Sequence, residues 1–160
     1  MSKALELVPA SFDDAREFVR RNHRHAVSPQ GHKFGIGAAL NGDLIGVAMI
    51  GRPVARHNDD GWTLEITRLC CLELAPVIDR RGKEHAQSAC SFLLGAAARA
   101  TFALGYRRLL SYTLQAESGA AMRAAGWRVI AEVKGRDWNC QARPRTERAV
   151  ADRLLWEHDA

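Results

Sequence analysis

The pattern of apolar and polar residues predicts a domain that mixes short strands with helices. Two segments carry apolar residues at helical spacing, one from Ser11 to about Arg21 and one from about Glu84 to Leu104, and a shorter helix is expected over residues 118–125. Strand-like runs occupy residues 5–8, 33–40, 44–51, 63–72, 107–114 and 127–134. The sequence therefore predicts an α/β (α+β) fold.

Capping and turn residues support several of these boundaries. Ser11 and Asp14 form the pattern of a capping box at the start of the first helix. Asn41-Gly42 lies between two apolar runs and is typical of a hairpin turn, while Gly105 follows the long helix, where a terminating glycine is common. From Gly135 onward no regular pattern is present, so this segment is expected to be irregular.

The composition indicates one packed domain. Of the 160 residues, 47% are apolar and 26% are charged, which excludes a disordered chain. The longest apolar run, Leu44 to Ile50, is far shorter than the roughly 20 residues that cross a bilayer, and no apolar leader follows Met1. We therefore expect a cytoplasmic protein without membrane contact. The four cysteines show no C-x-x-C spacing, so reduced thiols are expected.

Basic residues exceed acidic ones and are unevenly distributed. The formal charge is +5, with one basic group within residues 16–33, which also holds three histidines, and another within residues 134–153. Such groups attract nucleic-acid phosphates. A charge of this size is equally compatible with a solvated surface, so both interpretations stay open.

The order of elements resembles the GNAT superfamily of acyltransferases over roughly residues 4–134. Residues 103–109 look like that family's passage from its long helix into the next strand, and residues 120–127 look like its last helix and the turn after it. The resemblance implies a mixed, mostly antiparallel sheet of six to seven strands with helices on both faces. It also implies a GNAT-like domain over residues 1–134, with residues 135–160 as a basic C-terminal extension packed on the same domain.

The same resemblance implies acetyl-CoA or another acyl-CoA as the acyl donor. In GNAT enzymes the pyrophosphate of the donor rests on backbone N–H groups at the start of the long helix, because a helix N-terminus favours an anion. Residues 81–91 occupy this position and lack the family's pair of glycines. The candidate cofactor-binding residues are Ser88, Ser91, Leu69 and Cys70.

The strand at residues 63–72 contains a charged residue in an apolar row. Simple alternation places Arg68 on one face with Leu64, Ile66, Cys70 and Leu72. Because a buried guanidinium without an anionic partner is costly, Arg68 should either meet a carboxylate or line a polar site. Glu65 falls on the opposite face and is a candidate base only if the strand is bulged, as this strand commonly is in GNAT proteins.

A narrower resemblance is to phage and mobile-element GNAT-like proteins similar to the Mom type, which modify adenine in phage DNA. It rests on residues 22–25, 31–37 and 44–53, and residues 65–69 and 111–113 extend it. It implies catalytic roles for His23 and Arg68 and a role for Ser91 or Ser88. Residues 113–115 and 122 stand where that family has an Asp and a Tyr. Either the acid function moves to Glu117, or the chemistry differs, or this relative has lost it. The candidate substrate-binding residues are His25, His32, Ser111 and Tyr112.

The histidines also permit a metal interpretation. His23 and His25 have H-x-H spacing and lie close to His32 in the sequence. In a loop flanked by arginines this pattern favours hydrogen bonding or phosphate contact, so a metal site is the less favoured alternative.

Three functions remain. The leading hypothesis is an acyltransferase that modifies a nucleobase amine in DNA, with aromatic candidates Trp62, Trp138 and Tyr112 stacking on a flipped base. The alternatives are a conventional acetyl-CoA-dependent N-acetyltransferase of a small amine or a peptide, and a non-catalytic DNA-binding module. The oligomeric state is left open.

Overall fold

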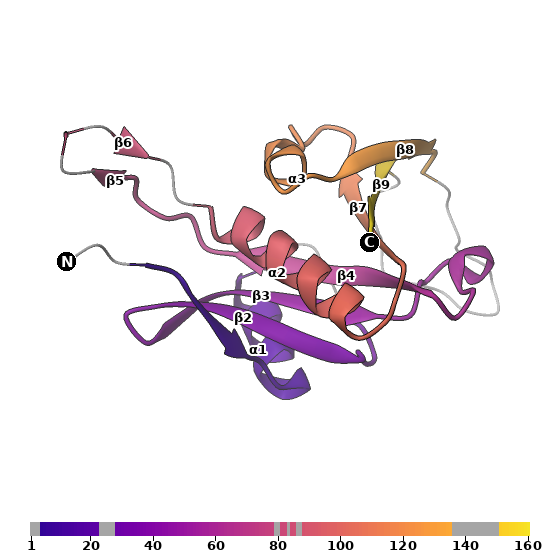
Figure 1. Ribbon diagram of the computed structural model, residues 1–160, viewed down its shortest axis with the longest axis horizontal. Helices are drawn as coiled ribbons and strands as arrows, with labels where there is room; N and C mark the ends of the chain where they lie inside the picture. The colour runs from indigo at the N-terminus through magenta and orange to yellow at the C-terminus, as the bar shows by residue number, and fades with distance from the viewer. Residues whose placement is uncertain (1–3, 23–27, 79–80, 83, 86–87, 136–150) are drawn as a thin grey trace.

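A seven-stranded sheet forms the centre of the computed structural model, which describes residues 4–22, 28–78, 81–82, 84–85, 88–135 and 151–160 (Figure 1). Its strand order is β1-β2-β3-β4-β7-β9-β8, and every pair is antiparallel except β4 with β7. The strands are β1 (Glu6–Pro9), β2 (Phe34–Leu40), β3 (Asp43–Gly51), β4 (Thr63–Cys71), β7 (Arg108–Leu114), β8 (Arg128–Val133) and β9 (Arg153–Asp159). The predicted mixed, mostly antiparallel sheet is confirmed.

Helices cover both faces of this sheet, as predicted. The helices are α1 (Phe12–Asn22), α2 (Ala89–Ala103) and α3 (Ala120–Ala124), with a short 3-10 turn, η1 (Arg56–Asn58), between β3 and β4. In Figure 1, α2 lies in front of the sheet and α1 behind it. Two separate cores result: α1 packs on one face through Ala15, Phe18 and Val19, and α2 packs on the other through Leu93 and Leu94. We call these the α1 face and the α2 face.

The first helix begins where its cap predicts. The Ser11 hydroxyl accepts a hydrogen bond from the Asp14 backbone N–H at 3.1 Å, and the Asp14 carboxylate accepts one from the Ser11 backbone N–H at 3.3 Å. This reciprocal pair is a capping box, which satisfies two N–H groups at the helix start. None of the described helices is both long and apolar enough to cross a membrane.

Two elements differ from the sequence-based expectation. The long helix begins at Ala89 instead of Glu84, because Ser88 is its N-cap and Glu84–His85 form the strand β6, which pairs with β5 (Val77–Ile78). The C-terminal segment contains β9, which lies between β7 and β8 in the sheet. Its apolar residues Leu154 to Trp156 stand in an arginine-rich region, and this obscured the strand pattern.

A β-bulge changes which side chains of β4 share a face. Met49 of β3 pairs with Arg68, whereas the next residue, Ile50, pairs with Ile66, so Thr67 is an extra residue in β4. Before the bulge Leu64 and Ile66 belong to the α2-face core; after it Leu69 and Cys71 pack there instead, while Cys70 belongs to the α1-face core. The predicted row that joined Leu64, Ile66, Arg68, Cys70 and Leu72 is therefore wrong.

The parallel pairing of β4 with β7 stops halfway along β4. The register joins residues 63–66 of β4 to residues 108–111 of β7 and goes no further. Figure 1 shows β7 and β9 turned away from the direction of β4. We call the two diverging segments, residues 67–71 of β4 and 112–114 of β7, the wedge. Their facing edges have no strand partner in the described part of the chain, so their backbone N–H and C=O groups can bind a ligand.

Candidate active site

Alternation with Leu64 and Ile66 places Glu65 on the α1 face, beside the start of the wedge, and the bulge brings Arg68 to the same face. Glu65 is only 5% exposed and pairs with Leu110 of β7 in the strand register. One carboxylate oxygen accepts a hydrogen bond from the Val54 backbone N–H at 2.9 Å. Burial raises the pKa of Glu65, and the Val54 N–H and the charges of Arg68 and Arg153 partly oppose this rise. A buried carboxyl with a raised pKa is suited to accept a proton near neutral pH.

Tyr112 is the first residue of β7 beyond the last pair with β4. Alternation along β7 places it on the same face as Leu110, and therefore as Glu65. Burial raises the pKa of the Tyr112 hydroxyl, and the Glu65 charge raises it further, whereas Asn58, Arg153 and Arg108 act in the opposite direction. Tyr112 therefore keeps its proton and can donate it.

Arg68 and Arg153 bring positive charge to the same face. Arg68 follows the bulge, and its Nη1 donates a hydrogen bond to the Thr67 carbonyl at 2.6 Å. Arg153 of β9 pairs with Leu114 of β7, two residues beyond Tyr112, so its side chain shares the face of Tyr112. We call Glu65, Tyr112, Asn58, Arg68 and Arg153 the Glu65 cluster.

The first turn of α2 lies at the open end of the wedge. The Cys71 thiol at the end of β4 lies beside the Cys90 thiol of α2, and this proximity raises the pKa of Cys71. The Ser88 hydroxyl accepts a hydrogen bond from the Ser91 backbone N–H at 3.1 Å, and the two hydroxyls lie 3.2 Å apart. Ser88 and Ser91 therefore have a capping role, with their hydroxyls beside the helix N-terminus.

The other sequence-predicted site residues are distributed over several places. Leu69 packs in the α2-face core and Cys70 in the α1-face core, so their side chains point to opposite faces. Ser111 is buried at the last paired position of β7. Glu117 is exposed in the turn after β7, where its carboxylate accepts the Leu114 N–H at 3.1 Å and its charge acts on Cys90. Glu117 thus lies toward α2.

Of the three candidate histidines, His32 is described, and His23 and His25 fall outside the described residues. The His32 ring packs edge-on against Phe12 with 5.2 Å between ring centres, and burial lowers its pKa. This contact holds the His32 ring beside the start of α1. Across the described ranges there is no group of three or more potential ligands that could hold a metal ion.

Three cysteines are described, and each is a free thiol, as expected: Cys70, Cys71 and Cys90. Of the aromatic candidates, Trp62 is half exposed and the Arg107 guanidinium stacks on its ring at 4.1 Å. Trp138 lies outside the described residues.

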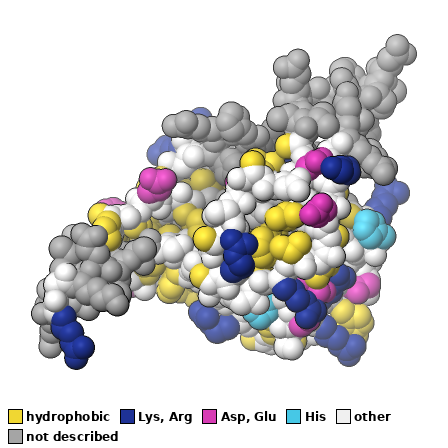
Figure 2. Space-filling model, turned by 90° about the horizontal axis from the view of Figure 1, so that it is seen from above, with side chains coloured by type: hydrophobic (Ala, Val, Ile, Leu, Met, Phe, Trp, Pro, Cys, Tyr) yellow, Lys and Arg dark blue, Asp and Glu magenta, His cyan; other side chains and the backbone are white. Residues whose placement is uncertain are grey.

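Many of the basic side chains on the described surface form ion pairs with acidic neighbours. Along α1, Arg16 pairs with Asp13, and Arg20 and Arg21 both pair with Glu17. The hydrogen bonds from Arg20 and Arg21 lower the pKa of Glu17 to about 2. On the face in Figure 2, Lys and Arg side chains stand singly or in small groups among acidic and apolar ones. This distribution favours a solvated surface over a continuous phosphate-binding surface.

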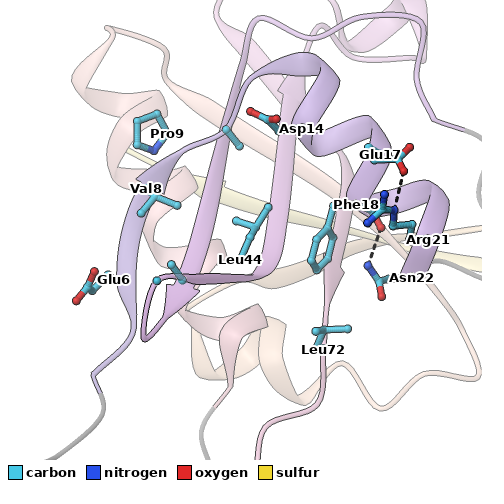
Figure 3. A pocket seen from close by; sticks show the side chains of 13 residues that line it. Glu6, Val8, Pro9, Asp14, Glu17, Phe18, Arg21, Asn22, Leu44 and Leu72 are labelled. Carbon is cyan, nitrogen blue, oxygen red and sulfur yellow. Dashed lines mark hydrogen bonds and ion pairs between the residues drawn. The ribbon is translucent and has the colours of Figure 1, made fainter.

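A groove of about 740 Å³ lies on the α1 face away from the Glu65 cluster. Figure 3 shows the side chains of Phe18 and Leu44 facing each other inside it, with Glu17 and Arg21 joined on the α1 side. Leu72, which follows β4, also lines it. The groove contains no residue of the Glu65 cluster.

Sequence analysis did not identify Asn58 and Arg153 as site residues. Asn58 stands in a polar loop, where no local pattern marks a residue that folds onto the sheet. Arg153 stands in the segment expected to be irregular, and only its pairing within β9 places it beside Tyr112. In both cases the residue reaches the site through the tertiary structure, which a local sequence pattern does not show.

Comparisons with known proteins identify the fold. No protein-family model matches the sequence, and a search of curated proteins finds no match. Solved structures match over nearly the whole chain. An IAA acetyltransferase from Bacillus cereus ATCC 14579 has a TM-score of 0.67 and 13% identity, covering 98% of this chain and 100% of that one.

Two further structures lead to the same fold. The ribosomal-protein-S18-alanine N-acetyltransferase from Escherichia coli gives a TM-score of 0.63 at 12% identity, covering 98% of this chain and 94% of the other. A Bacillus subtilis acetyltransferase in complex with CoA gives 0.55 at 13% identity, covering 99% of each chain. The chain therefore has the fold of the GNAT-family N-acetyltransferases.

Proposed function

We propose that this protein is an acyl-CoA-dependent N-acyltransferase. The observation that supports this most strongly is the position of a buried carboxyl, Glu65, and a protonated hydroxyl, Tyr112, on either side of the point where β4 and β7 separate. The transfer of an acyl group from a thioester to an amine needs a group that accepts the proton of the amine and a group that supplies one to the leaving sulfur.

The wedge and the first turn of α2 fit an acyl-CoA. The pantetheine arm of CoA carries two amide groups, which can pair with backbone groups of the wedge that have no strand partner. The N-terminus of α2 has no acidic residue in its first turn, so its backbone N–H groups suit the pyrophosphate. CoA supplies the acyl group as an activated thioester.

The residues of the chain then have distinct tasks. Glu65 accepts a proton from the incoming ammonium group, which leaves the amine free to attack. The charges of Arg68 and Arg153 oppose the rise of the Glu65 pKa and so favour its carboxylate form. Tyr112 donates a proton toward the departing sulfur.

Addition of acetyl-CoA is expected to stabilise the folded protein, because a ligand that binds only the native state raises the free energy of unfolding. At a concentration of 100 times its Kd the gain is about 2.7 kcal/mol, and the melting temperature should rise by roughly 5 to 10 °C. Differential scanning calorimetry measures this shift, with NAD at the same concentration as the nucleotide control. An equal shift with both compounds, or none with either, contradicts the proposal.

The DNA-directed version stays a narrower prediction. It rests on the Mom-type resemblance and on Arg68, whose charge lowers the pKa of Glu65. The paired arginines of α1 do not favour it. Mass analysis of nucleosides from cells that express the protein tests it, since an acylated base appears only if DNA is the acceptor.

A further inference from the structure

The Glu65 cluster contains a buried side-chain amide with an N–H donor to spare. Asn58 of η1 is 8% exposed, and no atom in the described part of the chain lies in hydrogen-bonding geometry with its side-chain nitrogen. The amide interacts with the Tyr112 hydroxyl and lowers its pKa. Because the amide nitrogen carries two N–H groups, at least one of them has no acceptor. A buried donor left unpaired costs about 1–3 kcal/mol, and such groups in native proteins commonly meet a ligand or an ordered water. An oxygen atom of a substrate is a suitable acceptor here.

The same cluster has a positive charge for which no described residue supplies an ion-pair partner. Arg153 is exposed and lies on the face of Tyr112, and its charge acts on both Glu65 and Tyr112. The neighbouring arginines of β7 and β8 do have ion-pair partners. Arg108 pairs with Glu157, and Arg128 pairs with Glu157 and Asp159. Arg153 is therefore able to bind an anionic group that approaches Tyr112.

Groups of opposite charge therefore lie on different strands of the α1 face. The Glu65 carboxyl is held on β4 by the Val54 N–H, and Arg153 lies across β7 from it, on β9. Asn58 and Tyr112 belong to the same group of side chains. A molecule with an ammonium group at one end and a carboxylate at the other complements this arrangement, because each end then meets a group of opposite charge or a donor.

We propose that the acceptor is a small amine that carries a carboxylate, with Arg153 and Asn58 as its binding residues. This inference rests on the proposed function. The ammonium group faces Glu65, and the carboxylate faces Arg153 and the Asn58 amide. During transfer, Glu65 takes one proton from the ammonium, and the N–C bond of the new amide forms as the C–S bond of the thioester breaks. The sulfur leaves with a proton from Tyr112, and the second proton lost by the nitrogen restores the Tyr112 hydroxyl.

Matched acceptors test this proposal. With acetyl-CoA as donor, release of the CoA thiol is measured for glycine and phenylalanine, for their amides, for 2-aminoethylphosphonate and for a single-stranded DNA oligonucleotide. The free acids are expected to exceed their amides by about tenfold in kcat/KM, since a charge-assisted hydrogen bond at an exposed arginine falls at the lower end of its usual range.

Variants of Arg153 assign the preference to this residue. Arg153→Ala is expected to lower kcat/KM for the acids about tenfold more than for the amides, chiefly through KM. Any loss common to acids and amides reflects the missing charge beside Glu65. Arg153→Lys should restore part of the loss, and Arg153→Glu should reverse the preference toward the amides. Arg16→Ala, which removes an exposed arginine of α1, is the matched control and should leave all acceptors unchanged.

The outcomes separate this inference from the proposed function. If acetyl-CoA stabilises the protein and the amides react as well as the acids, the carboxylate inference is wrong and the acyltransferase proposal stands. Preference for the phosphonate or the oligonucleotide also overturns it. If acetyl-CoA neither stabilises the protein nor releases thiol with any amine, the proposed function itself fails. Binding of N-acetylphenylalanine, measured by calorimetry without an acyl donor, should weaken about tenfold in Arg153→Ala.

Discussion

Replacement of Glu65 by Gln is expected to lower kcat by about 10²- to 10⁴-fold, which is the usual contribution of a positioned general base. Gln has nearly the same shape and can still accept the Val54 N–H, so the strand should keep its conformation. The steady-state rate of CoA release with a saturating amine measures the effect. A variant with wild-type kcat would show that Glu65 is not the base.

The pH dependence of the same variant provides an independent readout. Because burial raises the pKa of Glu65, the ionised form is populated only at a pH above the ordinary value of 4.5. The kcat/KM of the wild type should therefore rise with pH through this raised pKa, and Glu65→Gln should lack that acid limb.

Stability gives the control for Glu65→Gln. A carboxyl whose folded-state pKa is raised contributes stability below its unfolded pKa, and this contribution is lost as the pH rises through the folded pKa. At pH 7 the neutral Gln avoids the burial of a charge, so the melting temperature should equal or exceed that of the wild type. A loss of activity with a lower melting temperature would instead indicate damage to the fold.

Deletion of Thr67 is expected to leave cooperative folding intact and to lower activity. The deletion removes the extra residue, so the pairs Ile50–Ile66 and Met49–Arg68 become consecutive in a regular ladder, and Arg68 and Leu69 keep their faces of the sheet. The bend and extra twist that a bulge gives to β4 are lost, so the wedge should narrow. A displacement of about 1 Å at a reacting group can cost about 10²-fold in rate, so we expect a loss of that order in kcat/KM. Circular dichroism during thermal unfolding measures the folding, and the rate of CoA release measures the activity.

Thr67→Ala is the matched control for the deletion. It keeps the extra residue and removes only the hydrogen bond from the Thr67 hydroxyl to the Met49 carbonyl, which is 3.2 Å long. The expected cost is about 0.5–1.5 kcal/mol, with folding retained. If the deletion protein is as active as this control, the bulge does not shape the wedge.

The helix caps and the hairpin turn could be predicted from the sequence because their signals are local. Ser11 and Asp14 lie three residues apart and contact each other directly. Asn41 and Gly42 adopt positive φ angles of 54° and 86°, which this residue pair favours in a hairpin. Such features depend on a few neighbouring residues, so the sequence pattern suffices.

The site could be predicted only in part because it depends on register. Glu65 was a candidate conditional on a bulge, and a bulge leaves no mark in the apolar pattern of residues 63–72. The alternation rule therefore separated Arg68 from Glu65, although Thr67 brings both to one face. The position of Arg153 depends on a strand inserted between β7 and β8, a long-range pairing that local patterns do not encode.

A crystal structure of the protein with bound acetyl-CoA shows whether the wedge holds the donor. We expect the pantetheine arm between residues 67–71 of β4 and 112–114 of β7, with the thioester near Glu65 and Tyr112. A ligand bound instead in the groove beside Phe18 and Leu44, with no contact to the wedge, would show that the wedge is not the donor site.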